Sequence, residues 1–164
     1  MPKIIGIDLA GKETNPTGFC VLTEDASGIK TDVKVFYYDK DIIEEVKKEN
    51  PDLIAIDAPF GFPKEGYFRE SDKLLMEMGF KPLSPKFPNM GILVNRARNL
   101  IKSLEGYIII EVFPQATKKI LGIERERGVS KDKFDAMLCA LTGKYYLEGK
   151  YEAVGPEKII IPKL

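Results

Sequence analysis

Three acidic residues adjoin or interrupt segments that are otherwise apolar. Apolar residues 4–7 lead directly into Asp8, apolar residues 53–56 lead into Asp57, and Asp135 lies within an apolar helical stretch. Charged carboxylates are rarely buried without a partner. Neighbouring parallel strands end at the same edge of an open α/β sheet, which is where ligands bind. We therefore expect Asp8 and Asp57 to share one site. A hard divalent cation is the usual remedy for the repulsion within such a cluster.

Each of these residues also has a simpler interpretation. Asp8 and Asp57 could be polar residues that end their strands, and Asp135 could interact with the dipole of its helix. Two aspartates on adjacent strands, with side chains roughly 5 Å apart, favour a shared site. At about 100° per residue, Asp135 lies on the flank of the buried stripe of its helix, whereas Asp132 fits the dipole role better. We therefore expect Asp8, Asp57 and Asp135 to be catalytic and to bind Mg²⁺ or Mn²⁺.

Other charged residues could complete this site. Glu111 interrupts an apolar strand; it could be a structural partner of Arg69, but we expect it to be a fourth catalytic acid. Arg69 and Asp72 share one helical face and could form a surface ion pair of little energetic value. Alternatively, Arg69 contacts a substrate phosphate, and Lys131, just before the last helix, is a second candidate for substrate binding.

Composition excludes several other chemistries. The chain contains no histidine, so histidine-based nucleophile systems and histidine zinc sites cannot be built. Its two cysteines, Cys20 and Cys139, lie in apolar runs and are expected to be buried free thiols of a cytoplasmic protein. No segment resembles a signal peptide or a membrane span. Basic and acidic residues number 25 each, so any contact with nucleic acid must come from a local patch. The abundance of Lys and Glu is a feature of proteins from hyperthermophiles.

The hydrophobic pattern predicts one α/β domain that covers residues 1–164. Strands are predicted at residues 3–8, 18–22, 33–38, 53–57 and 107–113. Helices are predicted around residues 42–46 and at 69–78, 91–105, 115–121 and 132–147, the last with Ser130 as N-cap. The first three strands should form an antiparallel meander, and the later two should run parallel to the first. The result is a mixed five-stranded sheet flanked by helices; the opening meander argues against the alternative, a flavodoxin-like doubly wound sheet.

Two further segments stand out from this pattern. Residues 58–90 contain a proline-rich aromatic loop, a helix and a second irregular stretch, and we expect them to form an insertion that acts as a wall or lid beside the site. Residues 153–162 are expected to be an extended tail or an edge strand. The polar face of the 91–105 helix is basic through Arg96, Arg98 and Lys102, which is more typical of a solvated face than of a nucleic-acid surface.

Five segments in this order carry a resemblance to a known family. They are residues 6–10 (GIDLA), 55–61 (AIDAPFG), 69–72 (RESD), 111–117 (EVFPQAT) and 135–143 (DAMLCALTG). Together they resemble the domain of unknown function 429 family, which comprises predicted nucleases with a ribonuclease H-like fold. That family often has cysteine where this chain has Ser71, so a role for that thiol does not carry over. The resemblance implies a ribonuclease H-like fold, with Asp8, Asp57 and Asp135 at its key points.

These observations lead to the hypothesis of a metal-dependent nuclease. Carboxylate-bound Mg²⁺ or Mn²⁺ would support phosphodiester hydrolysis in DNA or RNA without a protein nucleophile or a histidine base. One alternative is a non-catalytic nucleic-acid-binding or scaffold protein on the same fold. A second alternative, a phosphotransferase, is disfavoured because the chain is long enough for only one such domain and has no Gly-x-x-x-x-Gly-Lys loop. The sequence leaves four questions open: whether the substrate is DNA or RNA, whether cleavage is endo- or exonucleolytic, how many metals bind, and how many subunits assemble.

Overall fold

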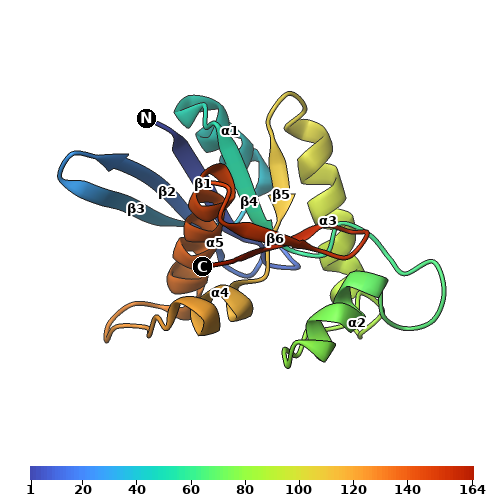
Figure 1. The fold of residues 1–164 in the computed structure, drawn as a ribbon. Coiled ribbons are helices and arrows are strands. Elements are labelled where there is room, and N and C mark those ends of the chain that lie inside the picture. Colours follow the sequence, from blue (N-terminus) through green and yellow to red (C-terminus); the bar gives the residue numbers. More distant parts are fainter.

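A mixed five-stranded sheet forms the centre of the molecule (Figure 1). The computed structural model describes residues 1–164. Strands β1 (Lys3–Asp8), β2 (Thr17–Asp25) and β3 (Gly28–Phe36) form an antiparallel meander. Strands β4 (Leu53–Asp57) and β5 (Ile109–Glu111) lie parallel to β1, which gives the order β3-β2-β1-β4-β5. The predicted mixed five-stranded sheet is confirmed, although β5 is shorter than the expected strand at 107–113.

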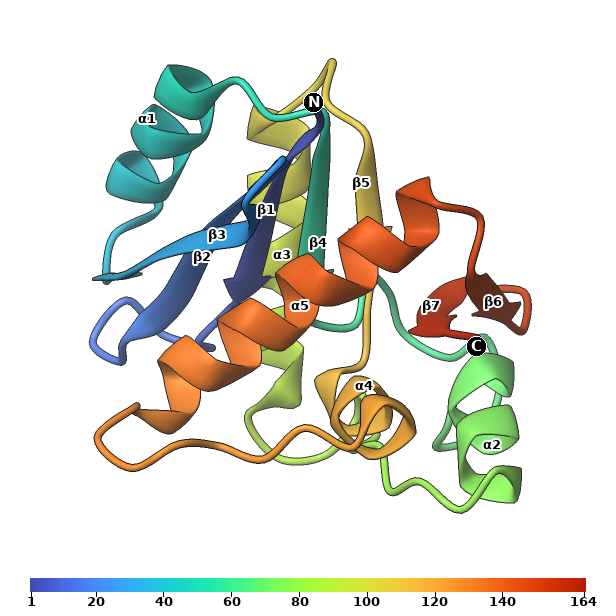
Figure 2. The same cartoon turned by 60° about the vertical axis from the view of Figure 1, so that its left-hand side comes forward.

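Helices cover both faces of this sheet (Figure 2). Helices α1 (Asp39–Glu49) and α3 (Met90–Ser103) pack on one face against alternate residues such as Ile5 and Ile7 of β1. Helix α5 (Lys131–Leu147) packs on the other face, against Ile4. Burial on both faces explains why β1 and β4 have continuous apolar sequences instead of alternating ones. Ser130 caps α5 as predicted, accepting a hydrogen bond from the backbone N–H of Lys133.

Helix α5 approaches the sheet unusually closely, and two glycines make this possible. A Cβ atom on Gly6 of β1 would lie 2.3 Å from the carbonyl oxygen of Ala136. A Cβ atom on Gly18 of β2 would lie 2.1 Å from the carbonyl oxygen of Asp132. Any side chain at either position would push the helix outward. The absence of Cβ atoms therefore sets how near the N-terminal turns of α5, including Asp135, come to the ends of β1 and β4.

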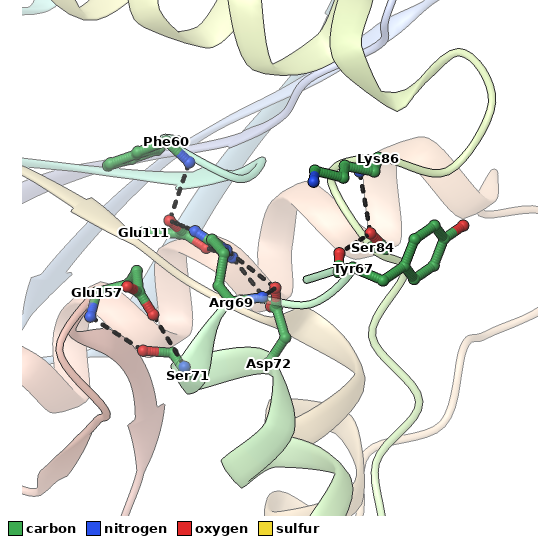
Figure 3. A network of polar contacts seen from close by, with 9 residues as sticks. All are labelled: Phe60, Tyr67, Arg69, Ser71, Asp72, Ser84, Lys86, Glu111 and Glu157. Atoms are coloured by element: carbon green, nitrogen blue, oxygen red, sulfur yellow. Dashed lines mark hydrogen bonds and ion pairs between the residues drawn. The ribbon is translucent and has the colours of Figure 1, made fainter. Parts of the chain in front are cut away.

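The insertion between β4 and α3 is an ordered structure with its own small core. Its helix α2 (Glu70–Glu77) contributes Leu75 to a cluster that also contains Ala116 of helix α4 (Pro114–Leu121). The Ser84 hydroxyl donates a hydrogen bond to the carbonyl oxygen of Tyr67 and accepts one from the backbone N–H of Lys86 at 3.0 Å (Figure 3). These bonds join the two irregular stretches that flank α2. The insertion therefore has a defined shape beside the sheet.

The segment at 153–162 differs from its expected role as an extended tail or edge strand. It belongs to a separate antiparallel hairpin made of β6 (Tyr151–Val154) and β7 (Ile159–Pro162). A single parallel bridge, between Val112 and Ile160, links the hairpin to the residue that follows β5, and Ile160 also packs in the core on that face of the sheet. Its turn contains Gly155 and Lys158, both with positive φ, so the chain reverses there instead of continuing as one strand. The hairpin packs beside α2 (Figures 1 and 2).

The two cysteines conform to a further expectation. Cys20 and Cys139 are both buried and free, as predicted. None of the helices combines the length and the apolar character that crossing a bilayer requires.

Candidate active site

Asp8 and Asp57 lie side by side at the carboxyl ends of β1 and β4. The parallel register pairs the two residues directly. Side chains alternate between the faces of a sheet. The preceding residues, Ile7 and Ile56, belong to the core on the α1 and α3 face, so both aspartates point to the face that α5 covers. The expected juxtaposition of these two carboxyl groups is therefore present.

Burial and nearby acidic residues raise the pKa values of both carboxyl groups. Burial, together with the nearby charges of Asp135 and Asp132, raises the pKa of Asp8 from 3.8 to about 7. Burial, together with the charges of Asp8 and Asp135, raises the pKa of Asp57 well above its usual range. A hydrogen bond with the Asp57 side chain opposes the rise in the pKa of Asp8 without cancelling it. At neutral pH the pair therefore retains protons that two exposed aspartates would have lost.

Asp135 faces the same region from the first turns of α5, but it does not join the pair directly. Its Oδ2 accepts a hydrogen bond from Lys131 Nζ at 3.0 Å. The Asp135 side chain is 17% exposed, whereas that of Lys131 is 78% exposed. No three acidic or cysteine side chains in the molecule converge closely enough to form a ready-made metal site. The three expected metal ligands therefore share one region, with Asp135 turned toward Lys131.

Arg69 and Glu111 are partners in a buried ion-pair network (Figure 3). The Arg69 nitrogens Nη1 and Nη2 donate to the two carboxylate oxygens of Glu111 at 3.0 and 2.7 Å. Its Nε and Nη2 donate to the two oxygens of Asp72 at 2.9 and 3.0 Å. Arg69 is 3% exposed, so it cannot form the surface ion pair considered from the sequence. The alternative in which Glu111 is the structural partner of Arg69 is confirmed.

This network also fixes the loop that follows Asp57. Glu111 Oε1 accepts a hydrogen bond from the backbone N–H of Phe60 at 3.0 Å. Burial raises the pKa of Glu111, while the hydrogen bonds and charge of Arg69 oppose that rise. Burial alone would lower the pKa of Arg69, but its bonds to Glu111 and Asp72 raise it. Arg69 and Glu111 therefore face the site as a paired, charged unit, and neither side chain is free to bind a ligand without breaking the network.

A second buried arginine holds the loop that follows Asp8. Arg96 of α3 is 7% exposed; its Nη1 donates to the carbonyl oxygen of Ala10 at 2.6 Å and its Nε to Asp39 Oδ1 at 2.8 Å. The backbone N–H of Ala10 in turn donates to the hydroxyl of Thr17, which is completely buried. The sequence interpretation of Arg96 as part of a basic solvated face is wrong. The sequence did contain a signal that Arg96 is buried, namely its place beside the apolar stripe that Val94, Ala97 and Leu100 form.

Glu157 is another residue whose role the sequence analysis missed. Its Oε1 accepts a hydrogen bond from the backbone N–H of Ser71 at 2.9 Å, and its own N–H donates to the Ser71 hydroxyl at 3.0 Å (Figure 3). Ser71 lies in the first turn of α2, where unpaired N–H groups favour a carboxylate. The turn of the β6–β7 hairpin is thus fastened to the helix that carries the insertion. No local sequence pattern links positions that are 86 residues apart.

These elements enclose a pocket of about 570 Å³. Its acidic floor contains Asp8 and Asp57, with Asp135 at one side and the Arg69 network at another. Besides the paired Arg69, four cationic residues line its rim: Lys81, Lys118, Arg125 and Lys131. All four are exposed. The pocket therefore combines a floor that can attract a cation with a rim that can attract an anion.

No protein-family model matches the chain, and no curated protein matches it in sequence.

Proposed function

We propose that the protein is a divalent-metal-dependent phosphodiesterase that acts on nucleic acid, built on a ribonuclease H-like variant of the α/β fold. The observation that carries the proposal is the direct pairing of Asp8 with Asp57 at the carboxyl edge of the sheet, with their raised pKa values. Further support comes from the strand order, from the position of Asp135 on the helix that covers this edge, and from the cationic rim of the same pocket.

The donor set fits Mg²⁺ or Mn²⁺ in its chemistry. Asp8 and Asp57 would supply the hard oxygen ligands that these ions prefer, and a cation would offset the burial and the nearby negative charges that now keep protons on the pair. Asp135 would complete the set by exchanging its contact with Lys131 for a place beside the other two carboxylates. When bound, such a metal activates water and neutralises charge on phosphate oxygens.

The residues of the chain would contribute in two ways. Lys131, once released by Asp135, and the other cations of the rim would orient the phosphate. The Arg69–Glu111 and Arg96–Ala10 contacts would keep the loops after Asp57 and Asp8 from moving during turnover. In the reaction, the oxygen of water bonds to phosphorus and the bond from phosphorus to the leaving sugar oxygen breaks. One proton of the water stays with the phosphate product or the buffer, and one is transferred to the leaving oxygen.

The test is a cleavage screen combined with measurement of metal binding. Single-stranded and duplex DNA, RNA and RNA–DNA hybrids would be incubated with Mg²⁺ or Mn²⁺ and the wild type, Asp57→Asn or Asp41→Asn. Asp41 is an exposed acid on α1 outside the pocket and is the matched control. We expect calorimetry to detect Mn²⁺ binding that Asp57→Asn abolishes and Asp41→Asn preserves, with cleavage following the same order. Equally weak Mn²⁺ binding by all three proteins, without cleavage, would instead support a non-catalytic scaffold.

A further inference from the structure

The pocket has the size of a site for a small ligand, not of a groove that binds a nucleic-acid duplex. Its volume of about 570 Å³ falls within the range of roughly 300–1,000 Å³ that is typical of pockets for small molecules and cofactors. A duplex-binding protein needs a basic surface that follows several phosphates. This chain has a formal net charge of zero, and the basic side chains at the site lie around one pocket.

One side of the pocket is closed by contacts between the insertion and α4. The backbone N–H of Lys81 donates to Gln115 Oε1 at 3.0 Å. Next to this bond, the Phe80 and Phe113 rings pack edge to face with centroids 6.0 Å apart, and Lys119 Nζ lies 5.4 Å from the centre of the Phe80 ring. The two segments therefore form a continuous wall. A polynucleotide cannot leave the pocket between them.

The cations of the rim are available to a ligand. Lys81 and Arg125 take part in none of the ion pairs of the structure. Lys118 has only a 3.7 Å contact with Glu124, whose side chain is 86% exposed, and such a contact is easily exchanged. Three cations from three segments can thus approach a phosphate group that lies above the acidic floor. Terminal phosphate groups carry more charge than internal phosphodiesters, so they gain most from this arrangement.

The same pocket offers an apolar surface. Leu83, Met90, Leu93 and Phe113 line it. Leu83 is 55% exposed although it lies on the structured insertion. An exposed apolar side chain beside a charged floor is suited to the flat face of a nucleobase, which is apolar on its faces and polar at its edges.

We infer that this pocket binds a single terminal nucleotide of a DNA or RNA strand, with its phosphate among Lys81, Lys118 and Arg125 and its base against Leu83. The inference deepens the proposed function and rests on it: a phosphodiesterase with this pocket acts on strand ends and releases nucleotides stepwise. Four features carry it together, namely the volume, the closed wall, the free cations and the exposed leucine. The inferred contacts involve the phosphate and the base, so they do not distinguish ribose from deoxyribose.

The first experiment measures binding without turnover. Adenosine 5′-monophosphate, its deoxy form, adenosine and ribose 5-phosphate would each be titrated into the wild type, Arg125→Gln and Arg127→Gln, with and without Mn²⁺. Arg127 lies in the same loop, is exposed and does not line the pocket, so it is the matched control. We expect both nucleotides to bind more tightly than either fragment. Arg125→Gln should weaken nucleotide binding about three- to tenfold, as expected for loss of a charged phosphate contact, and Arg127→Gln should match the wild type.

The second experiment compares linear single strands with covalently closed single-stranded circles of the same sequence. We expect mononucleotides from linear strands and no cleavage of circles. Cleavage of circles at the linear rate would overturn the inference and leave the proposed function intact. Nucleotide binding that depends on Arg125, without hydrolysis of any substrate, would support the inferred ligand and remove the proposed hydrolysis. Equal binding of nucleotide and fragments, or equal effects of the two arginine variants, would also overturn the inference.

Discussion

Replacing Asp8 by Asn should stabilise the metal-free protein at alkaline pH. The pKa of Asp8 rises from 3.8 to about 7 on folding because the carboxyl group is buried and lies near other acids. The folded state therefore retains a proton that the unfolded state has released. The free energy of unfolding must fall as the pH rises from about 4 to about 7. Each pKa unit corresponds to about 1.4 kcal/mol, so the loss above pH 7 has an upper limit of about 4 kcal/mol.

Asn cannot ionise, so Asp8→Asn removes this loss and also lowers the charge that raises the pKa of Asp57. We expect the variant to be about 1–3 kcal/mol more stable than the wild type at pH 8, because Asn still places a polar group in a buried site. At pH 4 the two proteins should differ little. Urea unfolding in the presence of a chelator, at several pH values between 4 and 8, measures both quantities.

The control for this experiment is Asp41→Asn, which should reproduce the pH dependence of the wild type, since Asp41 is exposed on α1. Excess Mn²⁺ should raise the stability of the wild type at pH 8 and leave Asp8→Asn nearly unchanged, because the ion binds only the folded site. The reasoning would be refuted if Asp8→Asn were less stable than the wild type at pH 8. Such a result would mean that the charged Asp8 is a stabilising hydrogen-bond acceptor and not a strained member of an acidic pair.

Three other substitutions test the supporting structure. Arg69→Met leaves two buried carboxylates without a partner and should lower the free energy of unfolding in urea by about 3–5 kcal/mol. The control Lys73→Met, in an exposed pair, should lower it by less than about 1 kcal/mol, and similar losses would contradict the role of the buried network. Gly6→Ala should displace α5, lower the melting temperature and weaken Mn²⁺ binding, since the new methyl group meets a helix carbonyl at 2.3 Å; unchanged Mn²⁺ affinity would show that helix position does not control the site. Arg96→Met should reduce kcat with little change in KM because it loosens the loop after Asp8. The control Arg98→Met, at an exposed position, should behave as wild type, and equal kinetics for the two variants would exclude a positioning role for Arg96.

The sheet was predictable because its signals are local. Apolar runs that end in aspartate identify β1 and β4 together with the edge where they meet, and the register of Asp8 with Asp57 follows from parallel pairing. Helix α5 was predictable from its periodicity and its serine cap. The pairing of Glu111 with Arg69 was the alternative that sequence reasoning did not choose, since a charge within an apolar strand requires a partner without specifying which one.

The features that sequence reasoning missed depend on contacts between distant segments. The Glu157–Ser71 bonds and the Arg96–Ala10 bond each join positions 86 residues apart. No spacing rule applies at that distance. The hairpin at 151–162 was mistaken for a single extended segment because its turn depends on a positive φ at Lys158, a residue that rarely adopts one. The pocket itself depends on how the insertion meets α4, which is a tertiary contact.

The attachment of the β6–β7 hairpin to α2 has a consequence for the order in which the molecule assembles. Residues 3–57 contain four of the five strands of the main sheet and are synthesised early. The insertion that forms a wall of the pocket is synthesised next. The hydrogen bonds between Ser71, in the first turn of α2, and Glu157 can form only after Glu157 has been synthesised. Contacts with such large sequence separation form late in folding. A nascent chain can thus form its acidic pair before the wall beside it is in place. The residues proposed to be reactive would then exist before the part of the pocket that selects the ligand.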